Sequence, residues 1–223
     1  MNELTIESYL TELGKKDGTP GGGSAAAYVA SMSAALLRMV ADIQKDKKTY
    51  ADQAESLGET LEKAQQLVHA FQQLAKDDAV AFEPVLLAYK LPKETPEEKA
   101  KRKKAVEEAI QGAAQPPLLM LEKSHELIDL IDELVSVRMK GTIVNDLMVS
   151  VLFVSTVLET AVLNVTINTR LLEDASVRAE LEDKAQACLK SGRERVSILK
   201  RAIQHFLEQD KWPDEGHDAS SGA

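Results

Sequence analysis

Aromatic residues and cysteine are scarce in this sequence, and positive charges are fewer than negative ones. Aromatics make up 4% of the 223 residues, so the core must be built mainly from Ala, Leu, Val and Ile. Such a core suits closely packed helices better than a β-sandwich, in which aromatic and β-branched residues dominate. A single cysteine, Cys188, excludes an intramolecular disulfide and a cysteine-rich metal site. A net charge of −9 argues against general nucleic-acid binding, which requires a basic surface.

Recognisable targeting and cofactor motifs are also missing. Residues 1–16 are amphipathic and lack the charged start and apolar stretch of a secretion signal, so we expect a cytoplasmic protein. There is no Walker-type phosphate loop, dinucleotide-binding fingerprint or nucleophile elbow. We expect no metal site either, because no metal-ligand spacing is shared by His69, His125, His205 and His217.

Apolar residues recur at helical spacing along most of the chain, and no strand pattern persists beyond a few residues. This pattern predicts an all-α protein, an antiparallel bundle of about five to seven helices. Residues 1–209 form one domain in this prediction, and the polar residues 210–223 form a disordered tail. The expected helices cover residues 3–13, 24–43, 49–89, 95–115, 118–137, 144–172 and 174–209.

Prolines mark several of the expected helix boundaries. Pro84 should kink the 49–89 helix late, because it removes one backbone donor and clashes with the preceding turn. Thr95 and Pro96 predict a strong helix start, and Glu98 completes a capping box there. Pro116 and Pro117 should break or bend this helix at its end, near Gln115.

Residues 147–165 are the most apolar stretch of the chain and contain one acid, Glu159. These nineteen residues are long enough to span a membrane. A helix of this kind is also typical of the centre of a soluble bundle, and the adjacent helices are strongly amphipathic. We therefore expect a central helix buried on all sides by other helices, and no membrane contact.

A glycine-rich segment precedes the second expected helix. Its three glycines allow backbone conformations closed to other residues and a close approach to a ligand. A helix start also presents unpaired N–H groups and a dipole that favour anions. The alternative is a flexible turn with Ser24 as the helix cap, but the small residues at 25–35 favour a rigidly held loop. The segment comprises Thr19, Pro20, Gly21, Gly22, Gly23 and Ser24.

Asp78 interrupts an apolar helical stripe. Helical steps place it on one face with Leu74 and Phe82, whereas its neighbour Asp77 points elsewhere. Burial would raise the pKa of the Asp78 carboxyl group, because the charged form loses hydration. A carboxyl group tuned in this way can exchange protons near neutral pH. The alternatives are a rim position, or a buried acid that pairs with Lys or Arg.

Polar residues also lie along the apolar helix, at Asp146, Asn164 and Asn168. The simplest role for Asn145 or Asp146 is to cap the start of this helix. Asn164 and Asn168 lie one turn apart, and a buried amide needs hydrogen-bond partners. These partners could be backbone groups, another subunit, or a heterocycle with matching donors and acceptors.

Basic residues cluster around the connector that begins at residue 90. A solvated helix face explains most of them. It explains Lys93 less well, because Lys93 lies in the connector itself. The cluster comprises Lys90, Lys93, Lys99, Lys101, Arg102, Lys103 and Lys104.

Together these segments resemble the formiminotetrahydrofolate cyclodeaminase / methenyltetrahydrofolate cyclohydrolase family. The matching pieces occur in the order TPGGGSAAA, KDDAVAF, YKLPKETPEEKAKR, NDLMVS and NVTIN, and the resemblance covers roughly residues 5–205. PGGGS and LPK-x-TPEEK are the specific pieces. One departure is the turn MKGTIVND, in which Asn145 stands where the family often has Ser. The formiminotransferase domain of longer relatives is absent from this sequence.

The resemblance implies an all-α homodimer with a folate site near the contact between subunits. It implies that Asp78 is the catalytic acid and base, that the glycine-rich segment lines the site, and that Lys93 and Arg102 bind the glutamate carboxylates of folate. It implies no cofactor beyond the tetrahydrofolate substrate. The residues expected to bind substrate are Pro20, Gly21, Gly22, Gly23, Ser24, Lys93, Arg102, Asp146, Asn164 and Asn168.

The activity implied by this resemblance is conversion of 5-formiminotetrahydrofolate to 5,10-methenyltetrahydrofolate and ammonia. The first alternative is hydrolysis of 5,10-methenyltetrahydrofolate to the 10-formyl compound. Two further alternatives are a non-enzymatic helical interaction protein, which would tolerate Gly22→Val, and a membrane-embedded helical protein.

Overall fold

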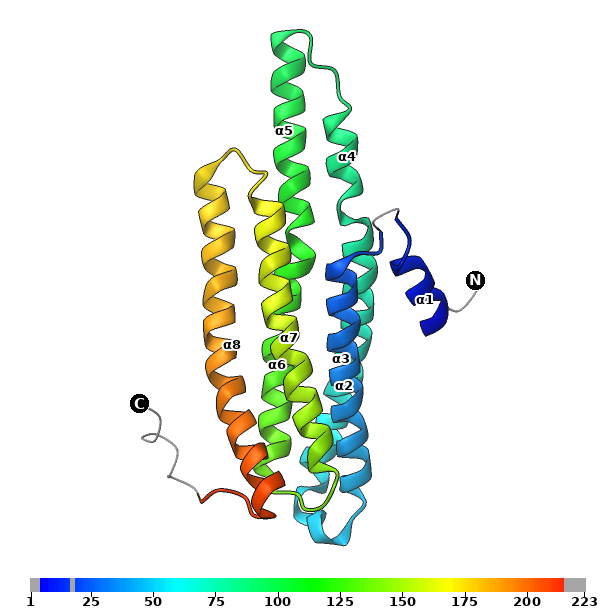
Figure 1. Ribbon diagram of the computed structural model, residues 1–223, viewed down its shortest axis with the longest axis vertical. Helices are drawn as coiled ribbons and strands as arrows, with labels where there is room; N and C mark the ends of the chain where they lie inside the picture. Colours follow the sequence, from blue (N-terminus) through cyan, green and yellow to red (C-terminus); the bar gives the residue numbers. More distant parts are fainter. Residues whose placement is uncertain (1–4, 17–18, 215–223) are drawn as a thin grey trace.

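The structure is a computed structural model that describes residues 5–16 and 19–214. This part of the chain contains eight α-helices, one short 3₁₀ helix and no strand (Figure 1). The prediction of an all-α bundle is therefore confirmed. The elements are α1 (Ile6–Leu13), α2 (Gly22–Lys45), η1 (Lys48–Gln53), α3 (Ala54–Ala81), α4 (Glu83–Tyr89), α5 (Pro96–Ala113), α6 (Gln115–Ser136), α7 (Val144–Thr169) and α8 (Ala175–Gln209).

Two pairs of consecutive helices run on almost without interruption. Phe82 alone joins α3 to α4, Ala114 alone joins α5 to α6, and both residues keep right-handed helical backbone angles. Pro84, Pro116 and Pro117 lie in the first turns of α4 and α6, where the missing N–H of proline has no helical partner to lose. Counted as continuous rods, the helices of the described residues number six, within the predicted range.

Small side chains let α2 pack closely against its neighbours. Ala27, Ala30 and Ala34 are fully buried in α2, which packs mainly against α3 and α7. The buried hydroxyl groups of Ser33 and Ser150 link α2 to α7 through a hydrogen bond of 2.6 Å. This close packing holds the start of α2, which the glycine-rich segment leads into, in a defined position relative to α3 and α7.

α7 is the central helix of the bundle, and α2, α6 and α8 pack around it (Figure 1). One face stays open: Leu152, Leu163 and Ile167 are 43%, 67% and 46% exposed. The prediction that this helix is buried on all sides is therefore wrong, because its neighbours cover only part of its circumference. By length and composition alone, α2 and α7 could cross a membrane, a test that the core helix of a soluble protein also passes.

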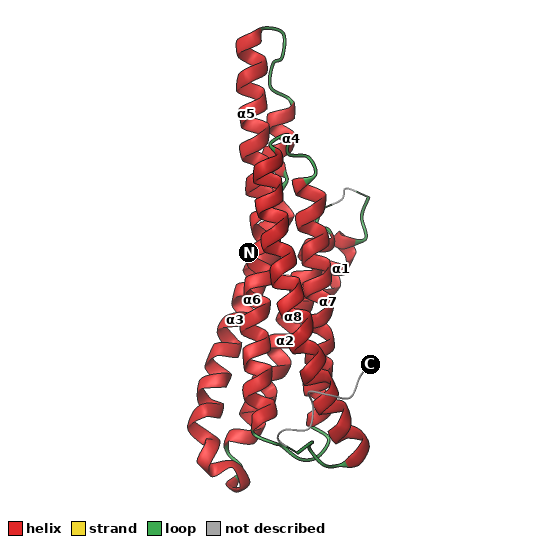
Figure 2. Ribbon diagram, turned by 90° about the vertical axis from the view of Figure 1, so that its left-hand side faces the viewer, coloured by secondary structure: helices red, strands yellow, loops and turns green. Residues whose placement is uncertain are grey.

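The hairpin of α4 and α5 projects beyond the other long helices (Figures 1 and 2). The capping box predicted at the start of α5 is present. The Glu98 N–H donates to Thr95 Oγ1 over 3.2 Å, and Glu98 Oε2 accepts from the Thr95 N–H over 3.0 Å. A small second core of Val85, Ile110, Ala113 and Leu172 ties the base of the hairpin to the end of α7.

The C-terminal residues that follow α8 pack against the bundle. Trp212 is 7% exposed, its ring lies 4.8 Å from that of Phe206, and its Nε1 donates to the Met139 carbonyl over 2.7 Å. The prediction of a disordered tail from residue 210 is therefore wrong for residues 210–214, because one buried indole outweighs its polar neighbours. The remainder of the predicted tail, 215–223, lies outside the described residues.

Candidate functional site

A cavity of about 200 Å³ lies where the start of α2 meets the α3–α4 junction, the end of α5 and the last turns of α7. It brings together three features that the sequence singled out: the glycine-rich segment, Asp78 and the two asparagines of α7. Its lining residues are Thr19, Gly21, Gly22, Gly23, Asp78, Ala79, Ala81, Phe82, Ala113, Asn164 and Asn168.

Asp78 lies in the last turn of α3 and is half-buried. On the same face Leu74 is buried and Phe82 is 37% exposed, so Asp78 marks the point at which the apolar stripe leaves the core. Burial raises the pKa of the Asp78 carboxyl group, and a hydrogen bond from the Ser24 backbone N–H partly opposes the rise. No cation contributes to the shift, so the alternative of a salt-bridged acid is not supported. The group can exchange protons closer to neutral pH than an ordinary Asp.

The glycine-rich segment supplies the first turn of α2. This helix begins at Gly22, two residues before the predicted start, so Ser24 is a residue of the helix and not its cap. Gly21 is the N-cap and makes no side-chain capping bond, which leaves the first N–H groups of α2 for other partners. Asp78 takes the N–H of Ser24, and its carboxyl group lies directly against Gly23.

Asn164 and Asn168 line the opposite side of the cavity from α7. The side-chain nitrogen of Asn164 donates to the Thr160 carbonyl over 2.7 Å, and that of Asn168 donates to the Ala113 carbonyl over 2.9 Å. One N–H of each side-chain amide is thus engaged by a backbone oxygen. The amide oxygens are the groups left to accept hydrogen bonds from a ligand.

Lys93 and Arg102 lie in a second cavity of about 230 Å³, between the α4–α5 hairpin and the segment after α7. The guanidinium of Arg102 lies 5.3 Å from the centre of the Tyr89 ring, and its Nε donates to the Tyr89 carbonyl over 3.3 Å. Tyr89 is seven residues beyond Phe82, about 10 Å along a helix, so the second cavity lies next to the first. It is lined by Tyr89, Lys93, Lys99, Arg102, Lys103, Val106, Glu107, Leu171 and Glu173.

Three of the predicted substrate-binding residues do not line either cavity: Pro20, Ser24 and Asp146. Pro20 is half-buried beside the cavity, and Ser24 is buried beneath it. Asp146 lies in the first turn of α7, about 27 Å along the helix from Asn164. Within one chain the structure therefore does not bring Asp146 to the site. The helix cap predicted for Asn145 or Asp146 is wrong, since Ile143 is the N-cap.

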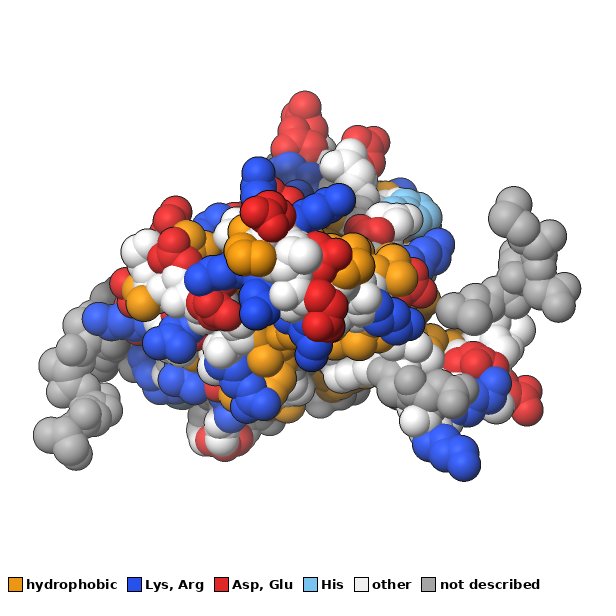
Figure 3. Space-filling model, turned by 90° about the horizontal axis from the view of Figure 1, so that it is seen from above, with side chains coloured by type: hydrophobic (Ala, Val, Ile, Leu, Met, Phe, Trp, Pro, Cys, Tyr) orange, Lys and Arg blue, Asp and Glu red, His pale blue; other side chains and the backbone are white. Residues whose placement is uncertain are grey.

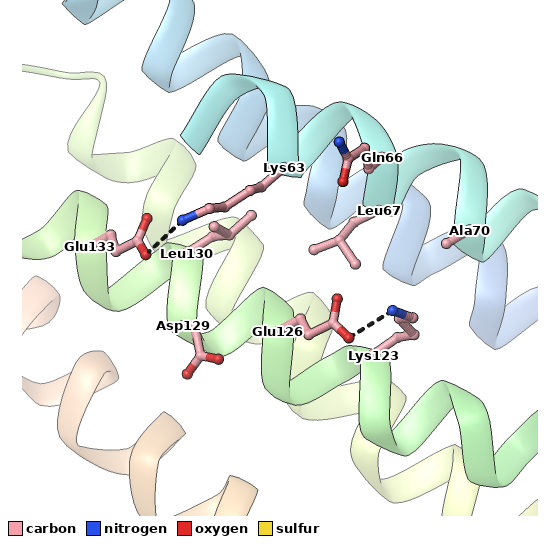
Figure 4. Close-up of a pocket in the computed structure, with 9 residues that line it drawn as sticks. All are labelled: Lys63, Gln66, Leu67, Ala70, Lys123, Glu126, Asp129, Leu130 and Glu133. Carbon is pink, nitrogen blue, oxygen red and sulfur yellow. Dashed lines mark hydrogen bonds and ion pairs between the residues drawn. The ribbon is translucent and has the colours of Figure 1, made fainter. Parts of the chain in front are cut away.

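A further groove of about 330 Å³ lies between α3 and α6, and Asp78 does not line it (Figure 4). Each of its charged side chains has an ion-pair partner, and that of Asp129 is Arg195, which lies outside the groove at 2.7 Å. Lys63 lies 3.5 Å from Glu133, and Lys123 lies 2.7 Å from Glu126. Because these charges are already neutralised and face solvent, we regard the groove as a gap between two helices and not as the site.

Sequence reasoning missed several of the lining residues. Phe82 shares a helical face with Asp78, and that spacing could have identified it. Ala113 could not be found in this way, because only tertiary packing brings the end of α5 to the cavity. In the part of the chain that the structure describes, no group of three or more His, Cys, Asp and Glu residues could hold a metal ion.

Comparison with known sequences identifies two kinds of relative. A methenyltetrahydrofolate cyclohydrolase from Methylorubrum extorquens is 38% identical over 176 residues, which cover 79% of this chain and 84% of that protein. A formimidoyltransferase-cyclodeaminase from Sus scrofa is 30% identical over 200 residues, 87% of this chain. The match spans 36% of the length of the Sus scrofa protein.

The fold also has a solved counterpart. The crystal structure of a formiminotetrahydrofolate cyclodeaminase from Thermotoga maritima matches with a TM-score of 0.75 at 24% identity, over 91% of this chain and 98% of that chain. The sequence profile described as formiminotransferase-cyclodeaminase matches residues 5–187, most of the chain. The chain belongs to the formiminotransferase-cyclodeaminase family.

Proposed function

We propose that this chain is an enzyme of folate one-carbon metabolism, in which Asp78 acts as acid and base on the carbon that joins N5 and N10. The observation that carries this proposal is the half-buried Asp78 carboxyl group, with a raised pKa, in a cavity formed by the start of α2 and two asparagines. Both activities named among the relatives require proton transfer at that carbon or its leaving group.

Hydrolysis of 5,10-methenyltetrahydrofolate is the first candidate, because the relative named for it is 38% identical and is matched over 84% of its length. A water oxygen bonds to the cationic bridging carbon while ionised Asp78 takes a proton from the water. The protonated carboxyl group then donates to N5 as the bond from N5 to this carbon breaks. The hydroxyl proton of the adduct leaves to solvent, and the product is 10-formyltetrahydrofolate.

Cyclodeamination of 5-formiminotetrahydrofolate is the second candidate, favoured by the Sus scrofa relative. N10 bonds to the formimino carbon, and Asp78 carries the N10 proton to the formimino nitrogen. A second proton, which the carboxyl group takes from solvent and passes on, lets this nitrogen leave as ammonia. The product is the 5,10-methenyl cation, which the ionised carboxylate stabilises electrostatically.

The pterin ring of the substrate suits the acceptors in the cavity. Asn164 and Asn168 have amide oxygens that can accept hydrogen bonds, and one N–H of each side chain already donates to a backbone carbonyl. The pterin carries an amino group and ring N–H groups, which are donors. The three glycines of the glycine-rich segment, with Pro20 and Ser24 behind them, would form the wall on the Asp78 side.

The second cavity suits the negatively charged end of folate. Lys93, Lys99, Arg102 and Lys103 outnumber Glu107 and Glu173 among its lining residues. Seen from the hairpin end, blue basic side chains gather among red acidic ones (Figure 3). A substrate with its pterin at Asp78 could extend its glutamate carboxylates about 10 Å towards the hairpin. Arg102 would bind a carboxylate through its two terminal nitrogens.

A homodimer would complete the site. The cavity at Asp78, about 200 Å³, is smaller than the roughly 300–1,000 Å³ of pockets that enclose small ligands. Both α2 and α7 also carry exposed apolar side chains, which together we call the α2–α7 patch: Met32, Met39, Ile43, Leu152, Leu163 and Ile167. A second copy packed on this patch would remove it from water.

The remaining properties follow from the same proposal. The two reactions transfer protons and groups without oxidation, so they call for no redox cofactor, and the acid and base role proposed for Asp78 needs no metal ion. The net charge of −9 suits a cytoplasmic protein that binds neither nucleic acid nor membrane surfaces, which are themselves negatively charged. The same charge leaves room for local basic sites such as the second cavity.

The decisive experiment follows the absorbance of the methenyl compound with each substrate in turn. We expect Asp78→Asn to lower the rate with the active substrate by about 10²–10⁴-fold, because the amide cannot exchange the proton. Asp77→Asn is the matched control: Asp77 is the exposed neighbouring acid, bonded to Gln73 over 2.8 Å. Its rate should stay near that of the wild type.

Two other results of this experiment would contradict the proposed function. Equal rates for the wild type and Asp78→Asn would show that this carboxyl group is not catalytic. No folate binding, and no rate above the spontaneous reaction with either substrate, would favour a non-enzymatic interaction protein.

A further inference from the structure

Tyr9 of α1 contacts the bundle next to the candidate site. The hydroxyl groups of Tyr9 and Ser24 lie 3.2 Å apart, and the ring of Tyr9 packs edge-on against that of Tyr28 with centroids 4.4 Å apart. By contrast, Ile6 and Leu10 of the same helix are 78% and 58% exposed. Tyr9 thus makes both the hydroxyl contact with Ser24 and the ring contact with Tyr28.

Ser24 connects this contact to Asp78. Ser24 is 1% exposed and lies in the first turn of α2. Its hydroxyl group contacts Tyr9, whereas its backbone N–H donates to the Asp78 carboxyl group. A buried hydroxyl group that lost its partner would have to find another by moving, and this turn of α2 would move with it.

We propose that Tyr9 is a positioning residue, whose hydroxyl group holds Ser24 and thereby fixes the carboxyl group of Asp78. The proposal rests on the proposed function only for its effect on activity. Tyr9 does not line the cavity, so it does not touch the substrate directly. It acts through the first turn of α2, whose N–H groups face the carboxyl group.

Few groups other than Ser24 affect the pKa of Asp78. None of the other residues that line the cavity is titratable. Two effects shift the pKa of the Asp78 carboxyl group: burial raises it, and the hydrogen bond from the Ser24 N–H lowers it. Removal of the Tyr9 hydroxyl should weaken the bond from Ser24. Because that bond favours the ionised carboxylate, the pKa of Asp78 should then rise further.

The test is an NMR titration of the Asp78 carboxyl carbon in the full chain, with Asp78→Asn to assign the signal. We expect Tyr9→Phe, which keeps the ring, to raise the Asp78 pKa and to lower kcat/KM by about 10-fold with the folate substrate. Ser24→Ala should have the same effect, and the double variant Tyr9→Phe/Ser24→Ala should add nothing, because both changes break one chain of contacts.

Tyr50→Phe is the matched control. The Tyr50 hydroxyl accepts a bond of 3.1 Å from the Lys140 N–H, and no contact joins it to Ser24. This variant should leave the Asp78 pKa and kcat/KM unchanged. An unchanged or lowered Asp78 pKa in Tyr9→Phe, or fully additive effects in the double variant, would overturn the proposal. The titration needs no substrate, so it reads the role of Tyr9 even if the proposed enzyme activity fails.

Discussion

The carboxyl group of Asp78 occupies the space that a side chain on Gly23 would need. An ideal Cβ placed on Gly23 would lie 2.6 Å from Asp78 Cγ, well inside the normal contact distance. The last turn of α3 and the first turn of α2 can approach each other this closely because Gly23 has no Cβ. The position of the Asp78 carboxyl group therefore requires a glycine at residue 23.

Gly23→Ala should displace the Asp78 carboxyl group. A shift of about 1 Å at a catalytic group can lower the rate by about 100-fold, so we expect a loss of this size in kcat/KM. Gly58→Ala is the control, because Gly58 also lies within a helix and has nothing within 4 Å of its ideal Cβ. A fully active Gly23→Ala enzyme would contradict this account of the site.

Gly22 does not offer the same test. Its ideal Cβ would meet nothing within 4 Å, so tolerance of Gly22→Val would not by itself indicate a non-enzymatic protein.

Asp78→Asn should stabilise the fold above the pKa of the folded-state carboxyl group. In the unfolded chain this pKa has its ordinary value near 3.8, and in the folded protein it is raised. Between the two values the folded state binds more protons, so the free energy of unfolding of the wild type falls as pH rises. Because Asn carries no charge, the free energy of unfolding of the variant does not fall in this way.

Urea unfolding at several pH values measures the difference. The variant should be the more stable protein at neutral pH, and the two curves should converge in acid as Asp78 becomes protonated. A variant less stable than the wild type at neutral pH would show that ionised Asp78 contributes to stability.

Arg102→Gln should weaken substrate binding without changing the chemical step. A charge-assisted hydrogen bond contributes about 1.5–3 kcal/mol, so we expect KM to rise about 10-fold or more while kcat stays near the wild-type value. The effect should shrink at high salt, which screens charge. Lys101→Gln is the control, because exposed Lys101 does not line the cavity. Equal KM values for both variants would remove Arg102 from the site.

Leu163→Glu should dissociate the proposed homodimer. Leu163 is 67% exposed on the α2–α7 patch, and a second copy packed there would have to bury the new charge. Light scattering after gel filtration would report the mass. Ile198→Glu on α8, at a residue 53% exposed and outside the patch, should leave the mass unchanged. A wild-type monomer would refute the dimer itself.

Trp212→Ala should lower the free energy of unfolding by about 3–5 kcal/mol, because it removes a buried ring and the bond to Met139. Lys211→Ala changes the exposed neighbour and should cost far less. Chemical denaturation of both variants would show whether residues 210–214 belong to the fold.

Local features were readable from the sequence because they depend on neighbours along the chain. Helical spacing, the Thr95–Glu98 capping box and the interruption of an apolar stripe at Asp78 all follow from residues within a few turns of one another. The open face of α7 was not readable, because apolar residues such as Leu163 and Ile167 look the same in a sequence whether or not a helix covers them.

The sequence by itself determined the helical class, the bundle and a short list of polar residues in unusual places. Only the tertiary structure decided which of them meet: Asp78 and Asn164 face one cavity, whereas Asp146 lies at the other end of α7. The physical reason is that the pattern of apolar residues along a helix predicts which face is buried but not which other helix packs on that face. The packing of α2 between α3 and α7 brings Asp78 of α3 and Asn164 of α7 to the same cavity.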